Sequence, residues 1–282
     1  MTSSIENTAQ KTVLITGCSS GIGLCAAQTL QQKGYHVLAS VRNSDDVSIL
    51  QDQGIDCLHL DLCDEDSIDK AVHYIHEQQL NLYGLVNNGA YGQPGAVEDL
   101  SRQALLEQFE TNVFGTHSLT QKLIPFFRQQ QAGRIIQISS VLGFIGLPMR
   151  GAYNASKFAL EGLSDTMRVE LMGTNIHVSL IQPGPIESRF RPNAYLAFAK
   201  HIDADNSIYK DDYAQVYDRL NRTENARFTL PASAVAKCIL HALDNNKPKV
   251  RYKVTTPTKV MAVLKRLLPD RSLDKFIRKQ GN

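Results

Sequence analysis

Tyr153 and Lys157 stand four residues apart, and Ser140 precedes Tyr153 by thirteen residues. In a helix, a spacing of four places two side chains on the same face, one turn apart. An ammonium group beside a phenol stabilises the phenolate, so we expect Lys157 to lower the pKa of Tyr153 from about 10 towards neutrality. A phenol tuned in this way exchanges a proton with a carbonyl or alcohol oxygen, and a serine hydroxyl hydrogen-bonds that oxygen as its charge changes. Tyr and Lys at this spacing also occur by chance on solvated helices, so the pair needs support from the rest of the chain.

A glycine-rich turn near the N-terminus provides that support, because it is suited to binding phosphate. It spans residues 16–23 and lies between an apolar run, residues 12–16, and a helix predicted over residues 21–33. Glycine lets the backbone bend sharply and approach a pyrophosphate, while the free N–H groups and the positive end of the helix face the negative charge. The residues of the turn predicted to hold a dinucleotide are Gly17, Ser19, Ser20, Gly21, Ile22 and Gly23.

Two other interpretations of this turn remain open from its residues alone. Gly17 to Gly21 also fits the G-x-S-x-G pattern of serine hydrolases, with Ser19 as the nucleophile. Only one strand can precede Ser19, and no HGGG-type oxyanion motif follows, which disfavours a hydrolase. The glycines could also form a turn with no ligand.

The elements that must position these residues alternate along the chain. Strands are predicted over residues 12–16, 35–41, 55–61, 82–86, 134–139 and 176–181, and helices over residues 21–33, 44–53, 66–79, 101–131 and 153–172. Strands that alternate with helices at this spacing predict an α/β fold: a doubly wound parallel sheet in three layers, joined by right-handed crossovers. We expect one domain over residues 10–256, with a substrate segment at about 188–228, and a C-terminal helical extension over residues 257–282.

The composition is that of a soluble enzyme. Hydrophobic residues make up 43% of the 282, enough for a large core, and no apolar run approaches the ~20 residues of a membrane span. The first ten residues lack the apolar centre of a signal peptide, and five cysteines, an odd number, fit reduced thiols, so we expect a cytoplasmic location. Residues 57–63 place Cys, His and Asp close together, but their strict alternation with leucine predicts a strand, and no metal is expected.

The C-terminal segment carries most of the positive charge. Residues 247–282 contain 11 Lys and Arg and 2 Asp, a net charge of +9, so residues 1–246 carry −7 and the whole chain +2. Apolar residues at helical spacing within residues 260–268 stand beside Lys259, Lys265 and Arg266, which predicts an amphipathic helix. That helix could pack on the body of the protein, or it could contact an anionic membrane surface. No motif supports nucleic-acid binding.

In combination, the motifs resemble those of the short-chain dehydrogenase/reductase family over residues 10–190. The turn of residues 16–23 has the family's T-G-x-x-x-G-x-G spacing. Residues 87–90, Asn-Asn-Gly-Ala, match the N-N-A-G motif with its last two residues exchanged. The resemblance implies a Rossmann-type fold, hydride transfer with a nicotinamide cofactor, and a catalytic tetrad of Asn112, Ser140, Tyr153 and Lys157.

The resemblance also implies roles for further residues. Asp61 and Leu62 correspond to the adenine-contacting position, Asn88 and Gly89 lie beside the ribose, and Tyr153 and Lys157 also contact the cofactor. In this family, the asparagine matched by Asn112 holds a water that links the lysine to a proton relay. The motif expected to grip the nicotinamide carboxamide contains Pro183, Gly184, Ile186 and Ser188.

The end of the second predicted strand indicates which nicotinamide cofactor binds. Enzymes that use NAD place a carboxylate there for the ribose 2′-hydroxyl, and that carboxylate repels a 2′-phosphate. Here the strand ends at Arg42, whose planar fork of donors suits a phosphate, and Ser19 offers a second donor. Asp45 and Asp46 come too late for the ribose and are expected to begin the next helix. We therefore predict NADP(H), with an exposed Arg42 of no functional consequence as the alternative.

The substrate is predicted only by class. Apolar residues in the loops near the site would line a pocket for an apolar carbonyl or alcohol, or would seal against one another or a partner subunit: Tyr91, Leu142, Phe144, Leu147, Met149, Phe190, Tyr195, Leu196 and Phe198. Medium- and long-chain aldehydes fit best, because the chain resembles the branch of the family that contains bacterial aldehyde reductases and hydroxysteroid and retinol dehydrogenases. A retinoid or steroid substrate, and a non-catalytic NADP-binding regulator, are the alternatives. In family members the helices corresponding to residues 109–130 and 153–172 pair between subunits, so we expect a homodimer or homotetramer, with Phe158, Leu163 and Met167 available for contact.

Overall fold

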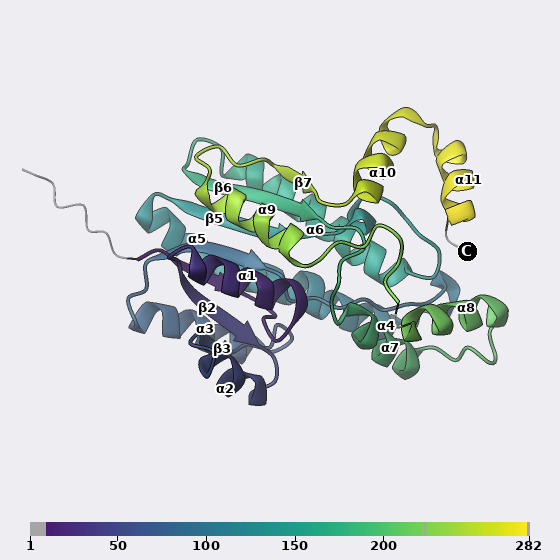
Figure 1. The fold of residues 1–282 in the computed structure, drawn as a ribbon, viewed down its shortest axis with the longest axis horizontal. Helices are drawn as coiled ribbons and strands as arrows, with labels where there is room; N and C mark the ends of the chain where they lie inside the picture. The colour runs from purple at the N-terminus through teal and green to yellow at the C-terminus, as the bar shows by residue number, and fades with distance from the viewer. Residues whose placement is uncertain (1–9, 223, 281–282) are drawn as a thin grey trace, which may run out of the picture.

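The computed structural model describes residues 10–222 and 224–280 and contains one sheet of seven parallel strands (Figure 1). The strands are β1 (Thr12–Ile15), β2 (His36–Val41), β3 (Asp56–His59), β4 (Leu82–Asn87), β5 (Gly133–Ile138), β6 (Ile176–Gln182) and β7 (Arg251–Lys253). Their order is β3-β2-β1-β4-β5-β6-β7. The chain therefore builds outward from β1 in one direction and then in the other. Such a reversal leaves a crevice at the carboxyl ends of β1 and β4, where ligands of open α/β sheets bind.

Helices cover both faces of the sheet. They are α1 (Gly21–Gln32), α2 (Asp45–Gln51), α3 (Glu65–Glu77), α4 (Arg102–Phe109), α5 (Thr116–Gln130), α6 (Gly151–Glu170), α7 (Phe190–His201), α8 (Lys210–Asn221), α9 (Ser233–Asp244), α10 (Thr256–Leu267) and α11 (Asp270–Gln280). Short 3₁₀ turns, η1 (Val97–Asp99) and η3 (Val141–Gly143), and a π-helical segment, η2 (Glu110–Gly115), complete the regular structure. Among the described helices, none is both long and apolar enough to cross a membrane.

The sheet has an apolar core on each of its two faces, because successive residues of a strand point to opposite sides. In β1, Val13 and Ile15 belong to the cluster formed with α1 and α9, whereas Leu14 belongs to the cluster formed with α3 and α5. Strand residues buried on both faces are typical of a parallel sheet covered by helices. The predicted three-layer, Rossmann-type α/β fold is thus confirmed.

Two helical pairs lie at the carboxyl end of the strands, α7 with α8 and α10 with α11 (Figure 1). Each has its own small apolar core. Phe198 and Tyr213 lie in the core of the α7–α8 pair, and Leu273 and Ile277 of α11 pack with Ile145 in the other. Residues 260–267 of the predicted amphipathic helix lie in α10, and Leu268 is its C-cap.

The structure differs from the predicted elements at several places, and the helices α7, α8 and α9 are among the elements that were not predicted. β7 was not predicted, because it is only three residues long and both of its outer residues, Arg251 and Lys253, are charged. The helical stretch predicted over residues 101–131 is interrupted by η2, which contains Asn112. A Cβ atom added at Gly115, the last residue of η2, would lie 1.7 Å from the backbone oxygen of Leu62. Only glycine therefore lets η2 pack so closely against the backbone at Leu62.

Candidate active site

Tyr153, Lys157 and Ser140 meet beside the carboxyl end of β5. Tyr153 and Lys157 lie in the first two turns of α6, and Ser140 follows β5 as the N-cap of η3. The Lys157 Nζ atom lies 5.8 Å from the centre of the Tyr153 ring and donates a hydrogen bond to the Ile138 backbone oxygen, 2.8 Å away. All three side chains are buried. The structure therefore brings these three predicted residues together.

Burial sets the protonation of this pair. It raises the pKa of Tyr153 to about 12, and a hydrogen bond from Ser140 opposes that rise only in part. It lowers the pKa of Lys157 to about 8, against the opposing effect of the Glu161 carboxylate. The prediction that Lys157 brings the pKa of Tyr153 towards neutrality is wrong here, because desolvation by burial raises that pKa and the Lys157 ammonium donates to a backbone carbonyl. The phenol is thus protonated at neutral pH.

Asn112 is held in η2 with its whole side-chain amide engaged. Its Nδ2 donates to the Tyr91 backbone oxygen at 2.9 Å and to Ser156 Oγ at 3.1 Å, and its Oδ1 accepts from the Tyr91 N–H at 3.2 Å. These bonds join the loop after β4 to α6, one residue before Lys157. Asn112 therefore positions that loop, and its proposed link to the lysine is indirect in this geometry.

The glycine turn needs glycine for two separate reasons. Gly17 has φ +72° and Gly21 has φ +57°, a region that side chains disfavour. At Gly23 the reason is space, since an added Cβ would lie 2.2 Å from the Gly17 backbone oxygen. The N-cap of α1, Ser20, makes no side-chain capping bond. The N–H groups at the start of α1 are therefore not used by a cap, as an anion-binding helix end requires.

The loop after β4 fastens this turn. Asn88 Nδ2 donates to the backbone oxygens of Thr16 and Gly17 at 2.9 and 3.0 Å. The Thr16 hydroxyl oxygen accepts the N–H groups of Asn88 and Gly89 at 2.9 and 2.8 Å. Sequence reasoning missed this role of Thr16, although the residue belongs to the motif. In this structure, Asn88 acts on the turn that would hold the cofactor. Asn87 fixes the end of β4 to α5 through a 2.8 Å bond to Thr120 Oγ1.

Three other predicted segments border the same turn. An added Cβ at Gly21 would lie 3.0 Å from the Ser188 Cβ, which places the loop after β6 directly against the start of α1. Leu62 lies against Gly89 at a corresponding 3.2 Å. One carboxylate oxygen of Asp61 accepts a hydrogen bond from the Cys63 N–H, at 2.9 Å. The fold thus brings together the predicted segments from β1, β3, β4 and β6.

The Pro183–Ser188 segment is fixed from behind. The Pro183 backbone oxygen accepts from the Val141 N–H at 2.8 Å, which ties the segment to the turn after Ser140. Gly184 has no room for a side chain, because an added Cβ would lie 2.2 Å from Thr255 Oγ1. Ile186 forms an isolated bridge with Leu230.

Arg42 directly follows β2, at the edge of the crevice. Its side chain is exposed, and it forms no ion pair with any residue that the structure describes. Asp45 and Asp46 lie in the first turn of α2, as predicted. The charged side chain that directly follows this strand is therefore a cation, and the carboxylates of Asp45 and Asp46 come later, in the first turn of α2.

These features fit a dinucleotide. The turn has room for a pyrophosphate because Gly17, Gly21 and Gly23 carry no side chain, and its helix end is uncapped. A cation stands where an adenosine ribose phosphate would lie in this fold. Within the described residues, no group of three or more His, Cys, Asp or Glu side chains is placed to hold a metal ion.

Phe190 stands in front of the reactive tyrosine. Its ring packs edge-on against the Tyr153 ring, with 5.2 Å between centres and 64° between planes. An added Cβ at Gly92 would lie 2.5 Å from the tip of Phe190, so the ring rests on that glycine. Because Phe190 is 38% exposed, its other side is free for contact with an apolar molecule.

Most of the other residues predicted to line a pocket have structural contacts instead. Leu196 faces solvent, and Phe198 is buried in the core of the α7–α8 pair, where Tyr195 and Met149 also pack. Phe144 and Leu147 pack with α10 and α11. Except for Leu196, these residues therefore pack against other side chains of the protein, which is the alternative to an apolar lining.

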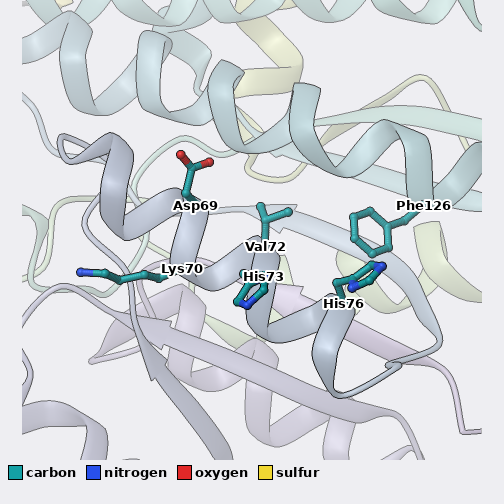
Figure 2. A pocket seen from close by; sticks show the side chains of 6 residues that line it. All are labelled: Asp69, Lys70, Val72, His73, His76 and Phe126. Atoms are coloured by element: carbon teal, nitrogen blue, oxygen red, sulfur yellow. The ribbon is translucent and has the colours of Figure 1, made fainter.

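A hollow on the surface of α3 and α5 lies apart from this site (Figure 2). It is lined by Asp69, Lys70, Val72, His73, His76 and Phe126. His73 pairs with Glu77, and His76 packs edge-on against Phe126. None of the predicted site residues lines this hollow.

Comparisons relate the chain to known proteins. The family model for short chain dehydrogenase matches residues 11–196. Over 269 residues the chain is 43% identical to "Uncharacterized oxidoreductase YbbO" of Escherichia coli strain K12, covering 95% of this chain and 94% of that protein. It is 34% identical to the NADPH-dependent 3-dehydrocapnine reductase of Ornithobacterium rhinotracheale, covering 94% and 95%. It is 31% identical to retinol dehydrogenase 8 of Bos taurus, covering 94% and 88%.

Solved structures give the same architecture. A short chain dehydrogenase/reductase from Burkholderia phymatum, in complex with NAD, superposes with a TM-score of 0.77 over 97% of this chain and 96% of that one. At 22% identity this likeness concerns the fold.

Proposed function

The chain belongs to the short-chain dehydrogenase/reductase family, and we propose that it is an NADP(H)-dependent oxidoreductase that reduces apolar aldehydes to alcohols. The observation that carries the proposal is that Tyr153, Lys157 and Ser140 lie together and that a chain of contacts joins Tyr153 to the glycine turn. Phe190 contacts Tyr153, the Phe190 N–H donates to Ser188 Oγ at 3.3 Å, and Ser188 lies against Gly21. A carbonyl group placed beside Tyr153 is thereby close to the dinucleotide crevice.

The cofactor supplies the hydride when it is bound, and the protein supplies the proton. The phenol of Tyr153, protonated at neutral pH, donates that proton to the carbonyl oxygen as negative charge develops there. The Ser140 hydroxyl hydrogen-bonds the same oxygen. Lys157, charged below a pKa of about 8, stabilises the phenolate that the transfer leaves behind. This arrangement favours reduction at neutral pH, since oxidation of an alcohol would need the phenolate first.

The choice of NADP(H) over NAD(H) rests on Arg42. An exposed guanidinium that forms no ion pair with the described residues is free to bind a 2′-phosphate, and the acidic residues that follow, Asp45 and Asp46, lie further on in the first turn of α2. The relative from Ornithobacterium is named as NADPH-dependent, and the Burkholderia structure holds NAD. Both cofactors thus occur among these proteins, so the choice of NADP(H) for this chain depends on Arg42.

The aldehyde substrate rests on the apolar approach to Tyr153. Phe190 offers an aromatic surface beside the reactive oxygen, and an aldehyde carbon chain would lie against it. A second candidate is a retinol- or hydroxysteroid-type dehydrogenase, which the relative named retinol dehydrogenase 8 supports. A non-catalytic NADP-binding regulator is disfavoured, because Tyr153 and Lys157 are both present and adjacent.

The test is a substrate panel. We expect the purified protein to oxidise NADPH with straight-chain aldehydes, and the rate to rise with chain length. Retinal and ketosteroids serve as the comparison, and a clear preference for either would transfer the assignment to the second candidate. NADPH binding without turnover on any carbonyl would support the regulator.

We further propose a homodimer or homotetramer that acts in the cytoplasm. Phe158 and Leu163 are each 40% exposed on α6, as a contact surface requires. Met167 is buried in the core, so its predicted availability for a subunit contact is wrong. Light scattering at micromolar concentration tests the assembly, and a monomer alone would contradict it.

A further inference from the structure

The outer face of α10 carries exposed apolar side chains that the fold does not use. Val260, Val263 and Leu267 succeed one another at spacings of three and four residues, which places them along one stripe of the helix. They are 47%, 56% and 71% exposed. Met261 and Leu264, in contrast, pack on the Ile145 side with α11. The apolar stripe therefore adjoins the face that joins α10 to the protein and extends beyond it to solvent.

The inner face fixes the direction in which this stripe points. The Thr255 side chain caps the first turn by accepting the Thr258 N–H, and Pro257 stands at the helix start. Lys265 Nζ donates to the Phe144 backbone oxygen at 2.6 Å. Phe144 belongs to the loop that follows Ser140. α10 is thus anchored on the active-site end of the molecule, with the apolar stripe turned outward.

Cations border the stripe. Lys259 stands four residues before Val263 and Arg266 three residues after it, so both lie along the same edge. α10 contains no acidic residue. The exposed basic residues of this helical pair that form no ion pair with the described part of the chain are Lys259, Lys265, Arg266, Arg271, Lys275 and Arg278. Of these, Lys265 donates to the Phe144 backbone oxygen. The charge of the others is therefore available to an external anion.

We propose that the outer face of α10 docks the protein onto an anionic lipid surface. Apolar side chains of this arrangement enter the boundary between headgroups and acyl chains, while the bordering cations meet lipid phosphates. A nucleic acid would use the cations and leave the apolar stripe in water. A second copy of the chain would cover the stripe, but the stripe has no acidic residues of its own to meet the cations of a symmetric partner face.

The placement of α10 gives this docking a consequence. α10, α11, α7 and α8 all lie at the carboxyl end of the strands, where the site is (Figure 1). Leu196 and Ile208, at that end, are 67% and 83% exposed. If the proposed activity on apolar carbonyls holds, docking brings the site close to the phase in which such substrates dissolve. The docking itself does not depend on that activity.

Vesicle cosedimentation of the full chain tests the proposal. We expect binding to phosphatidylcholine vesicles that contain phosphatidylglycerol, little binding to phosphatidylcholine alone, and release as salt is raised. Each basic residue near such a surface contributes about fivefold to partitioning, so Lys259→Gln with Arg266→Gln should weaken binding ~25-fold. Lys33→Gln with Lys70→Gln makes the same change in net charge at exposed positions elsewhere and should leave binding nearly intact.

A second variant, Val263→Ser with Leu267→Ser, tests the apolar stripe and should also weaken binding at unchanged charge. Both side chains are exposed, so circular dichroism and the melting temperature should match the wild type. The proposal is overturned if the wild type ignores anionic vesicles, if the serine variant binds as well as the wild type, or if the control pair loses as much binding. A change of oligomeric state in the serine variant, seen by light scattering, would instead assign the stripe to a contact between copies.

Discussion

Replacing Arg42 by alanine tests the cofactor assignment. The structure makes the change easy to interpret, because Arg42 is exposed and forms no ion pair with the described residues, so its removal leaves no buried partner behind. We expect weaker NADPH binding and unchanged NADH binding, since NADH has no 2′-phosphate for the guanidinium to meet.

The size of the effect follows from the exposure of Arg42. A hydrogen bond to a charged group contributes about 1.5–3 kcal/mol, and solvent screening places an exposed arginine at the lower end. A loss of ~1.5 kcal/mol corresponds to roughly tenfold in affinity. Arg42→Asp adds repulsion of the phosphate and should reverse the preference. Ser40 and Val41 are poorer positions for that carboxylate, because both side chains are buried.

The assay is kcat/KM with NADPH and with NADH for wild type and variants. Arg128→Ala is the matched control, because this arginine is also exposed but lies at the end of α5. The NADPH-to-NADH ratio should fall about tenfold in Arg42→Ala and stay constant in Arg128→Ala. A wild type that prefers NADH, or a ratio that Arg42→Ala leaves unchanged, would refute the assignment.

Three further predictions concern the site. Lys157 loses its charge above its pKa of about 8, whereas Tyr153 stays protonated to about 12, so reduction should be constant below pH 8 and decline above it; a pH profile of kcat checks this. Gly23→Ala forces a methyl group against the Gly17 oxygen, so NADPH affinity should fall by tenfold or more in a fluorescence titration, and an unchanged affinity would contradict the proposed cradle. Phe190→Ala removes the aromatic contact, so KM for long aldehydes should rise more than KM for short ones in steady-state kinetics.

The periodicity of the sequence predicted the sheet, because strands buried on both faces are near-continuous apolar runs between helices. It could not predict β7, which has only three residues, a tyrosine between two charged side chains. This segment becomes a strand because it pairs with the edge of β6. Nor could it predict η2, since that segment depends on the approach of Gly115 to Leu62, two segments far apart in the chain.

Site positions were predicted better than site electrostatics. The spacing of Tyr153 and Lys157 fixes their shared helix face, whichever way the rest of the chain folds. The pKa values depend on how much water the surrounding elements exclude, and for Lys157 also on the Glu161 carboxylate. The exclusion of water is a tertiary property that no local sequence pattern encodes. The same limit applies to Phe198, whose burial against Tyr213 is a tertiary contact.

The central claim is that the Tyr153 hydroxyl moves the proton in a carbonyl–alcohol interconversion. Tyr153→Phe removes that hydroxyl and keeps the ring that packs on Phe190, so the fold and the cofactor crevice should persist. The direct measurement is kcat for the reduction of one aldehyde by NADPH. The affinity for NADPH is measured on the same sample by fluorescence titration. We predict a fall in kcat of ~100-fold or more with affinity nearly unchanged. Turnover comparable to the wild type in the phenylalanine variant would contradict the account.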